Sequence, residues 1–250
     1  MFLDMTSEEI TAMCFVFFIA GFVTTTSWLS MAVRSLAEQP DIQERLYREN
    51  ETVIAQLIQE KNSKEKGGSL SLSGEGDKNT VNTEAFKVIT WENLTEFKYL
   101  RAVLDETLRL YPPGAAIERT ATEDAVLTTS NDQEIYVKRG DIVHIATYSM
   151  HRDGKHFGPD PNVFNPDRFL KQKIESSRHK YAFLPFGAGP KNCIGQVLAY
   201  EEASLAMIHL LRRYRFQLQL NSSTSEQEVQ FASIFNLMVP KSVKVVVEKR

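Results

Sequence analysis

Hydrophobic residues recur at helical spacing through much of this chain. Residues 10–33 contain no charged side chain, which predicts a long helix that is apolar on every side. Residues 41–61, 90–111 and 197–213 place apolar side chains three and four positions apart, the pattern of helices with one buried face. The second helix is expected to begin with Asp41 as its N-cap, directly after a proline.

Shorter runs show the features of β-strands. Residues 125–128 and 134–137 flank a polar turn and predict a hairpin, and residues 141–146, 216–220 and 241–247 predict further strands. The chain is therefore expected to be mainly α with small β-sheets, an α+β fold.

A polar stretch rich in glycine and serine covers residues 66–79. It predicts a flexible surface loop at about residues 63–82 rather than a domain boundary, so residues 1–250 are taken as a single domain.

The apolar stretch at residues 10–33 is long enough to cross a membrane, and its position also suggests a signal peptide. Two features argue against both interpretations. Thr6 and Glu9 form a capping box in an acidic flank, and the middle of the stretch is polar, from Thr24 to Ser27. A helix inside a large protein is the favoured interpretation, and no membrane anchor is expected in this chain.

Composition narrows the classes of function. The chain has 250 residues, of which 42% are hydrophobic and 24% charged, as in soluble globular proteins. A net charge of −3 gives no indication of nucleic-acid binding. Cys14 and Cys193 are too few for a disulfide framework, which fits a reducing compartment, and no histidines have metal-binding spacing.

The segment around Cys193 carries the strongest chemical signal. A loop rich in glycine leads from Phe186 to Gly195, and the helix at residues 197–213 follows. Cys193 is therefore expected near a helix N-terminus, where free N–H groups and the helix dipole stabilise a thiolate. Such a thiolate can be a nucleophile or a metal ligand, although no local histidine completes a nucleophile signature.

The spacing of this loop resembles F-x-x-G-x-R/H/K-x-C-x-G, the ligand loop of the cytochrome P-450 (haem-thiolate monooxygenase) family. The resemblance implies that Cys193 is the axial thiolate of haem b. It also implies that Gly189 and Gly195 give the loop and the macrocycle room, that Phe186 packs beside the sulfur and limits its exposure, and that Lys191 faces a haem propionate.

The apolar helix carries a second matching motif, Ala20-Gly21-Phe22-Val23-Thr24, which resembles A/G-G-x-D/E-T. By that resemblance Ala20 and Gly21 leave space for dioxygen, and Thr24 relays protons to it. Val23 departs from the pattern, because the family usually has an acid there. A purely structural alternative is that the threonine hydroxyls donate hydrogen bonds to backbone carbonyls of their own helix.

Further matches are structural or concern the propionates. Glu106 and Arg109 share a helix face, and the resemblance makes them a structural triad with Arg168. It also assigns Arg119 to a propionate. A second E-x-x-R pair, Glu175 and Arg178, is interpreted as a solvated surface pair.

The resemblance covers the C-terminal half of the family's fold, from the long distal helix to the end, so the chain is expected to lack the N-terminal half. The implied activity is monooxygenation of an apolar small-molecule substrate, with NADPH supplying electrons through a flavoprotein reductase. The implied location of a full-length relative is the cytosolic face of the endoplasmic reticulum membrane, and otherwise the cytoplasm.

Several alternatives stay open. A peroxide isomerase or dehydratase of the same cofactor class is suggested by Val23, and a truncated, non-catalytic haem-binding fragment by the length. A cysteine-nucleophile hydrolase and a membrane-spanning protein are weaker alternatives.

Overall fold

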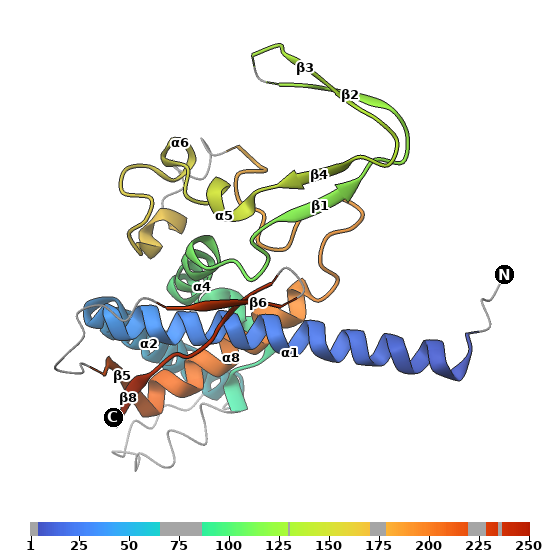
Figure 1. Ribbon diagram of the computed structural model, residues 1–250. Coiled ribbons are helices and arrows are strands. Elements are labelled where there is room, and N and C mark those ends of the chain that lie inside the picture. The colour runs from blue at the N-terminus through green and yellow to red at the C-terminus, as the bar shows by residue number, and fades with distance from the viewer. Residues whose placement is uncertain (1–4, 66–86, 130, 171–178, 220–228, 235–236) are drawn as a thin grey trace.

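A computed structural model describes residues 5–65, 87–129, 131–170, 179–219, 229–234 and 237–250. These residues form helices with small antiparallel sheets beside them, so the predicted class, mainly α with small β-sheets, is confirmed (Figure 1). Residues 66–82 of the predicted loop and the Glu175/Arg178 pair lie outside the described residues.

Helix α1 (Ser7–Glu38) has two different halves. Thr6 and Glu9 form the predicted capping box, with Thr6 Oγ1 accepting from the N–H of Glu9 at 3.2 Å. The first half projects from the body and its large side chains are exposed, among them Phe15 and Phe18 (Figure 1). Buried positions start at Thr25, so the expectation of a helix inside the protein is correct only for the second half.

By length and composition α1 is able to cross a membrane, and it is the one described helix that passes this test. A single helix of this kind is weak evidence for a span, because core helices and signal sequences have the same composition.

Helix α2 (Pro40–Glu65) follows α1 after one residue. Pro40 occupies the first helical position, where its missing N–H costs no hydrogen bond. Asp41 therefore lies within the first turn and is not the N-cap, which corrects that prediction. The helix runs to Glu65, beyond the predicted end at residue 61.

The helix predicted at residues 90–111 is divided in two. A 3₁₀-helix, η1 (Trp91–Glu96), is followed by helix α4 (Lys98–Leu110). Phe97 breaks the helix, since its backbone is non-helical and its side chain is 1% exposed in the core. The break between the two helices comes from burial of the Phe97 ring, and the local sequence pattern gives no sign of that burial.

Each described sheet has two antiparallel strands. Strand β1 (Ile117–Thr120) pairs with β4 (Ile142–Ile145), and β2 (Ala125–Thr128) pairs with β3 (Glu134–Val137), the predicted hairpin, which projects from the body (Figure 1). The remaining pairs are β5 (Tyr214–Leu218) with β8 (Val245–Lys249) and β6 (Phe231–Ile234) with β7 (Leu237–Pro240). The last pair was not predicted.

The core lies among α1, α2, α4 and helix α8 (Gln196–Arg213). Short helices α5 (Thr147–Met150) and α6 (Gly154–Phe157) and the 3₁₀-helix η2 (Pro166–Phe169) lie beyond α4 (Figure 1). Gln43 of α2 is 1% exposed and joins three elements: it donates to Leu36 O and Phe216 O and accepts from Phe216 N–H, each at 2.9 Å.

Candidate functional site

A cavity of about 310 Å³ contains the thiol of Cys193 in its wall. We call it the cysteine cavity. Its walls come from α1, the end of α4, strand β1 and the loop before α8. The lining residues used below are Thr24, Trp28, Arg119, Phe186, Gly187, Lys191 and Cys193.

The loop that carries Cys193 is shaped by two glycines. Gly187 and Gly189 have φ values of 74° and 82°, a left-handed conformation that other residues rarely adopt. The N–H of Asn192 donates to Gly189 O at 3.1 Å, and the N–H of Cys193 donates to Phe186 O at 2.9 Å. The loop folds back on itself and holds the cysteine three residues before α8, with Gly195 as the N-cap.

Cys193 is a free and exposed thiol. A Cβ on Gly195 would lie 4.0 Å from the sulfur, which is an ordinary van der Waals contact. Phe186 does not shield the sulfur as expected. Its ring packs instead against Trp28 at 6.1 Å and Tyr200 at 5.2 Å between centroids.

Two cations line the same cavity. Arg119 lies on β1, where Nη1 donates to Glu118 O at 2.8 Å and Nη2 lies 3.5 Å from Ala188 O. These contacts are with carbonyl groups, and no carboxylate among the described residues pairs with this guanidinium. Lys191 is exposed on the cysteine loop. Two positively charged side chains therefore line the cavity that contains the thiol.

Thr24 reaches this cavity, whereas Ala20 and Gly21 lie one turn earlier and outside its lining. Thr24 Oγ1 donates to Ala20 O at 2.6 Å, which is the hydrogen bond within the helix that the structural alternative predicts. A Cβ on Gly21 would meet no atom within 4 Å, so this side of α1 is open. The structure thus brings Thr24 together with Cys193, Arg119 and Lys191.

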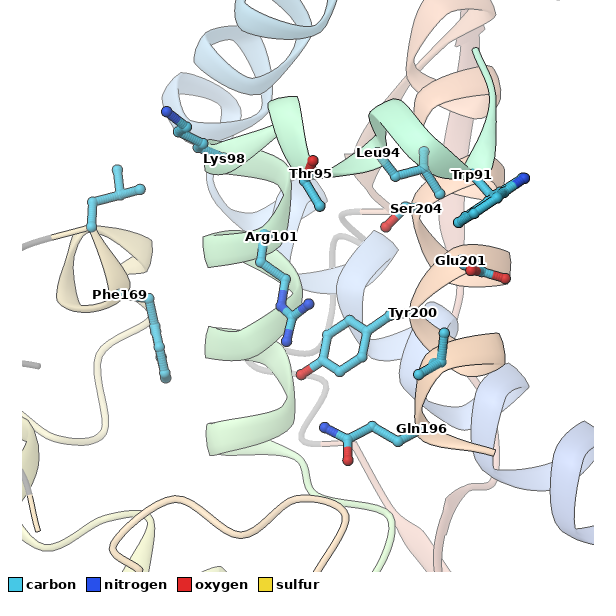
Figure 2. Close-up of a pocket in the computed structure, with 12 residues that line it drawn as sticks. Trp91, Leu94, Thr95, Lys98, Arg101, Phe169, Gln196, Tyr200, Glu201 and Ser204 are labelled. Carbon is cyan, nitrogen blue, oxygen red and sulfur yellow. The ribbon is translucent and has the colours of Figure 1, made fainter. Parts of the chain in front are cut away.

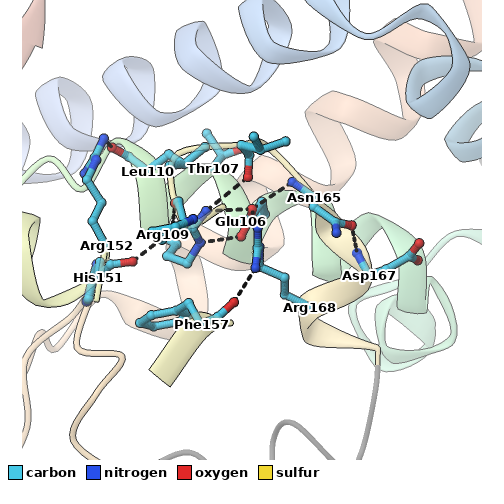
Figure 3. A network of polar contacts seen from close by, with 12 residues as sticks. Glu106, Thr107, Arg109, Leu110, His151, Arg152, Phe157, Asn165, Asp167 and Arg168 are labelled. Atoms are coloured by element: carbon cyan, nitrogen blue, oxygen red, sulfur yellow. Dashed lines mark hydrogen bonds and ion pairs between the residues drawn. The ribbon is translucent and has the colours of Figure 1, made fainter. Parts of the chain in front are cut away.

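The predicted triad joins α4, which carries Glu106 and Arg109, to η2, which carries Arg168 (Figure 3). Arg109 forms a bidentate pair with Glu106, with Nε–Oε2 at 2.6 Å and Nη2–Oε1 at 2.8 Å, and both side chains are fully buried. Arg168 Nε approaches Glu106 Oε1 to 3.5 Å, and the N–H of Asn165 donates to Oε1 at 2.8 Å. Arg109 also donates to the carbonyls of His151 and two other residues, Pro161 and Val163. The network fixes the irregular segment around η2 onto α4.

His151 is a site residue that the sequence did not reveal. It is 0% exposed, and its Nε2 accepts the N–H of Leu184 at 2.9 Å, just before the cysteine loop. Burial lowers the pKa of His151 to about 4, and the charges of Arg109 and Arg152 act in the same direction. The imidazole is therefore neutral, as an acceptor at Nε2 requires.

The arrangement fits a haem group in its donor set. One cavity is lined by a soft thiol ligand, by two cations suited to carboxylates and by the loop that Gly187 and Gly189 turn. Within the described part of the chain no cluster of histidine, cysteine and carboxylate side chains offers another metal site.

Comparison with known proteins also points to a haem protein. The family model for cytochrome P450 matches residues 3–66 and 77–245. The chain is 34% identical to probable cytochrome P450 6a14 of Drosophila melanogaster over 86% of its own length and 36% of the relative. It is also 34% identical to cytochrome P450 3A41 of Mus musculus, over 84% of the chain and 34% of the relative. The chain thus spans about a third of the length of the curated relatives that it matches.

Proposed function

The chain belongs to the cytochrome P450 family, and from this membership we propose that it binds haem b through Cys193 in a haem-thiolate monooxygenase. One observation carries the proposal: the free thiol of Cys193 lies in one cavity wall with Thr24, Arg119 and Lys191. When bound, haem would supply the redox chemistry that inserts one oxygen atom of O2 into an apolar organic substrate.

The residues of the chain have distinct roles in this proposal. The Cys193 thiolate would bind the haem iron, and the left-handed conformation of Gly189 shapes the loop that presents it. Arg119 and Lys191 would hold the two carboxylates of the macrocycle by charge. Phe186 fixes the loop by packing on the core, while Glu106, Arg109 and Arg168 hold the fold that supports it.

Thr24 would hold a water molecule at the cavity and relay a proton through its hydroxyl, and one turn earlier Gly21 leaves that side of α1 open. The adjacent Val23 is apolar and offers no acid to resupply that proton. This observation favours a second candidate, an isomerase or dehydratase that rearranges a peroxide and needs no proton delivery from solvent.

We propose a flavoprotein reductase as the source of electrons from NADPH, and the cytosolic face of the endoplasmic reticulum membrane as the location of the whole protein. Lys191 is an exposed cation on the cysteine loop, and its charge suits such a docking face. Arg212 and Arg215 are already engaged in ion pairs with Glu51 and Glu44, at 2.6 and 3.1 Å, which supports a structural role for both.

The test is a spectrum of the reduced protein with carbon monoxide after expression with haem available. The red-shifted Soret band of a thiolate-ligated ferrous–CO complex is expected. It should disappear in Cys193→Ala and persist in Cys14→Ala, which removes the other exposed thiol. Folded protein without the band would contradict haem binding and leave the non-catalytic fragment as the better description.

A second measurement separates the two chemistries. NADPH oxidation with a reductase reports dioxygen chemistry, whereas turnover of an organic hydroperoxide alone supports the isomerase. Val23→Glu restores an acid beside Thr24 and is expected to raise coupling of NADPH oxidation to product. Unchanged coupling would refute the role given to the missing acid.

A further inference from the structure

Aromatic side chains connect the cysteine cavity to a second cavity. The second cavity, of about 620 Å³, lies among η1, α4, η2 and the start of α8 (Figure 2). We call it the tyrosine cavity, because Tyr200 forms part of its wall. Trp28 and Phe186 line the cysteine cavity, and both rings contact Tyr200.

The contact between Trp28 and Tyr200 is close and buried. Their ring centroids lie 5.0 Å apart, with the ring planes at 89°. Trp28 is 2% exposed and its Nε1–H donates to Leu104 O at 3.1 Å. Tyr200 is 8% exposed. Apart from thiols, indole and phenol are the protein side chains that lose one electron most readily. Here the indole of Trp28 lines the cysteine cavity, the phenol of Tyr200 lines the tyrosine cavity, and the two rings are in contact.

The phenol has a proton acceptor in place. Tyr200 Oη donates to Asp105 Oδ1, and Arg101 Nε pairs with Oδ2 of the same carboxylate at 3.1 Å. The guanidinium of Arg101 also lies 3.5 Å from the centre of the Tyr200 ring, as Figure 2 shows for the two side chains. Burial, reinforced by the charge of Asp105, raises the pKa of Tyr200, so the phenol keeps its proton until it is oxidised.

We propose that Trp28, Tyr200 and Asp105 form a proton-coupled electron relay between the two cavities. A one-electron oxidant in the cysteine cavity, such as an oxidised metal centre, takes one electron from Trp28 and leaves an indole radical cation. Tyr200 returns one electron to Trp28 and transfers its hydroxyl proton to the Asp105 carboxylate. The products are intact Trp28, a neutral tyrosyl radical and a neutral Asp105 carboxyl group, so electrons and protons balance.

The Arg101 cation beside Tyr200 couples the loss of the electron to the loss of the proton. The Arg101 cation over the ring opposes a positively charged phenol, so the proton must leave with the electron. Asp105 accepts it through an existing hydrogen bond. An external one-electron donor of the phenol class enters the tyrosine cavity and gives one electron to the tyrosyl radical, while Asp105 returns its proton to Tyr200. The donor releases its own hydroxyl proton to water and leaves as a neutral phenoxyl radical. The relay thereby removes oxidising equivalents from the thiol site, an activity distinct from oxygen insertion.

The experiment attaches the oxidant to the chain, so that it does not depend on haem binding. A ruthenium polypyridyl photosensitiser is coupled to Cys193 in a Cys14→Ser background, and a flash with a soluble quencher generates the one-electron oxidant. The narrow transient absorption band of a tyrosyl radical is expected. Tyr200→Phe keeps the ring and should lose the band, while Tyr136→Phe, at an exposed hairpin position, should retain it.

Three further measurements bear on the route. Trp28→Phe and Asp105→Asn should each strongly reduce the yield of the band, and hydroquinone should shorten its lifetime. Near-ultraviolet circular dichroism verifies the fold of every variant. An absent band in the folded parent protein, a band that survives Tyr200→Phe, or a yield unchanged in Trp28→Phe and Asp105→Asn would overturn the relay. A lifetime insensitive to hydroquinone would overturn the role of the tyrosine cavity.

Discussion

Replacement of His151 by glutamine should make the stability of the protein less sensitive to mild acid. The imidazole is buried and neutral, with a pKa of about 4 in the folded state against an ordinary value of 6.5. The unfolded chain therefore binds one more proton than the folded protein between these values, and the free energy of unfolding falls as the pH falls through this window. Glutamine has no charge to gain, and its side-chain oxygen replaces Nε2 as the acceptor for Leu184 N–H.

The magnitude follows from the two pKa values. Their difference corresponds to about 3 kcal/mol once the pH is below both. Between about pH 7 and about pH 5.5 the expected loss of stability is about 1.2 kcal/mol, before most carboxylates titrate. Burial also lowers the pKa of His209, but that residue is present in both proteins and cancels in the comparison.

The assay is urea unfolding followed by circular dichroism at several pH values in this range. Wild type is expected to lose about 1.2 kcal/mol more than His151→Gln, whatever the absolute stability of the variant. His179→Gln, an exposed histidine, should behave as wild type. Parallel pH profiles for wild type and His151→Gln would refute the assignment of a neutral, buried acceptor.

Three other substitutions test the supporting structure by urea unfolding. Glu106→Gln leaves the guanidinium of Arg109 buried without its counter-charge and should cost about 3 kcal/mol, whereas Glu118→Gln at an exposed position should be nearly neutral. An equal effect of the two would contradict the buried network. Gly187→Ala places a Cβ at a φ of 74° and should cost about 1–2 kcal/mol, while Gly154→Ala, with a negative φ and open space, is the matched control. Gln43→Ala leaves backbone groups of β5 and α1 unpaired and should cost about 3 kcal/mol, and a loss below about 0.5 kcal/mol would show that water replaces the side chain.

Local patterns predicted those elements that local forces determine. The β2–β3 hairpin lies at the predicted residues because its strands and turn are adjacent in sequence. The Glu106–Arg109 pair follows from positions one helical turn apart. By contrast, the break at Phe97 depends on the burial of its ring in the core. The exposure of the first half of α1 depends on which other elements pack against that helix. The spacing of hydrophobic residues along the chain reports neither of these tertiary contacts.

The candidate site shows the same division. Spacing along the chain located Cys193 and Thr24, and the fold brings both to one cavity, although their proposed roles stay predictions. His151 and Tyr200 were missed because their partners, Leu184 and Asp105, are distant in sequence. A histidine or tyrosine in a helix or turn gives no sign of the group that it will meet, so these contacts required the structure.

Thr24 lies next to the boundary between the projecting and packed halves of α1. This position links the wall of the cysteine cavity to the helix–coil equilibrium of the projecting half. A helical segment without packed neighbours is held by its own hydrogen bonds, and such segments fray from the free end. The fraying can proceed as far as Thr25, the first buried residue of α1. The order of one cavity wall therefore depends on how well the distant first turn is capped. Solvents or substitutions that strengthen this turn will act on the wall without contacting it.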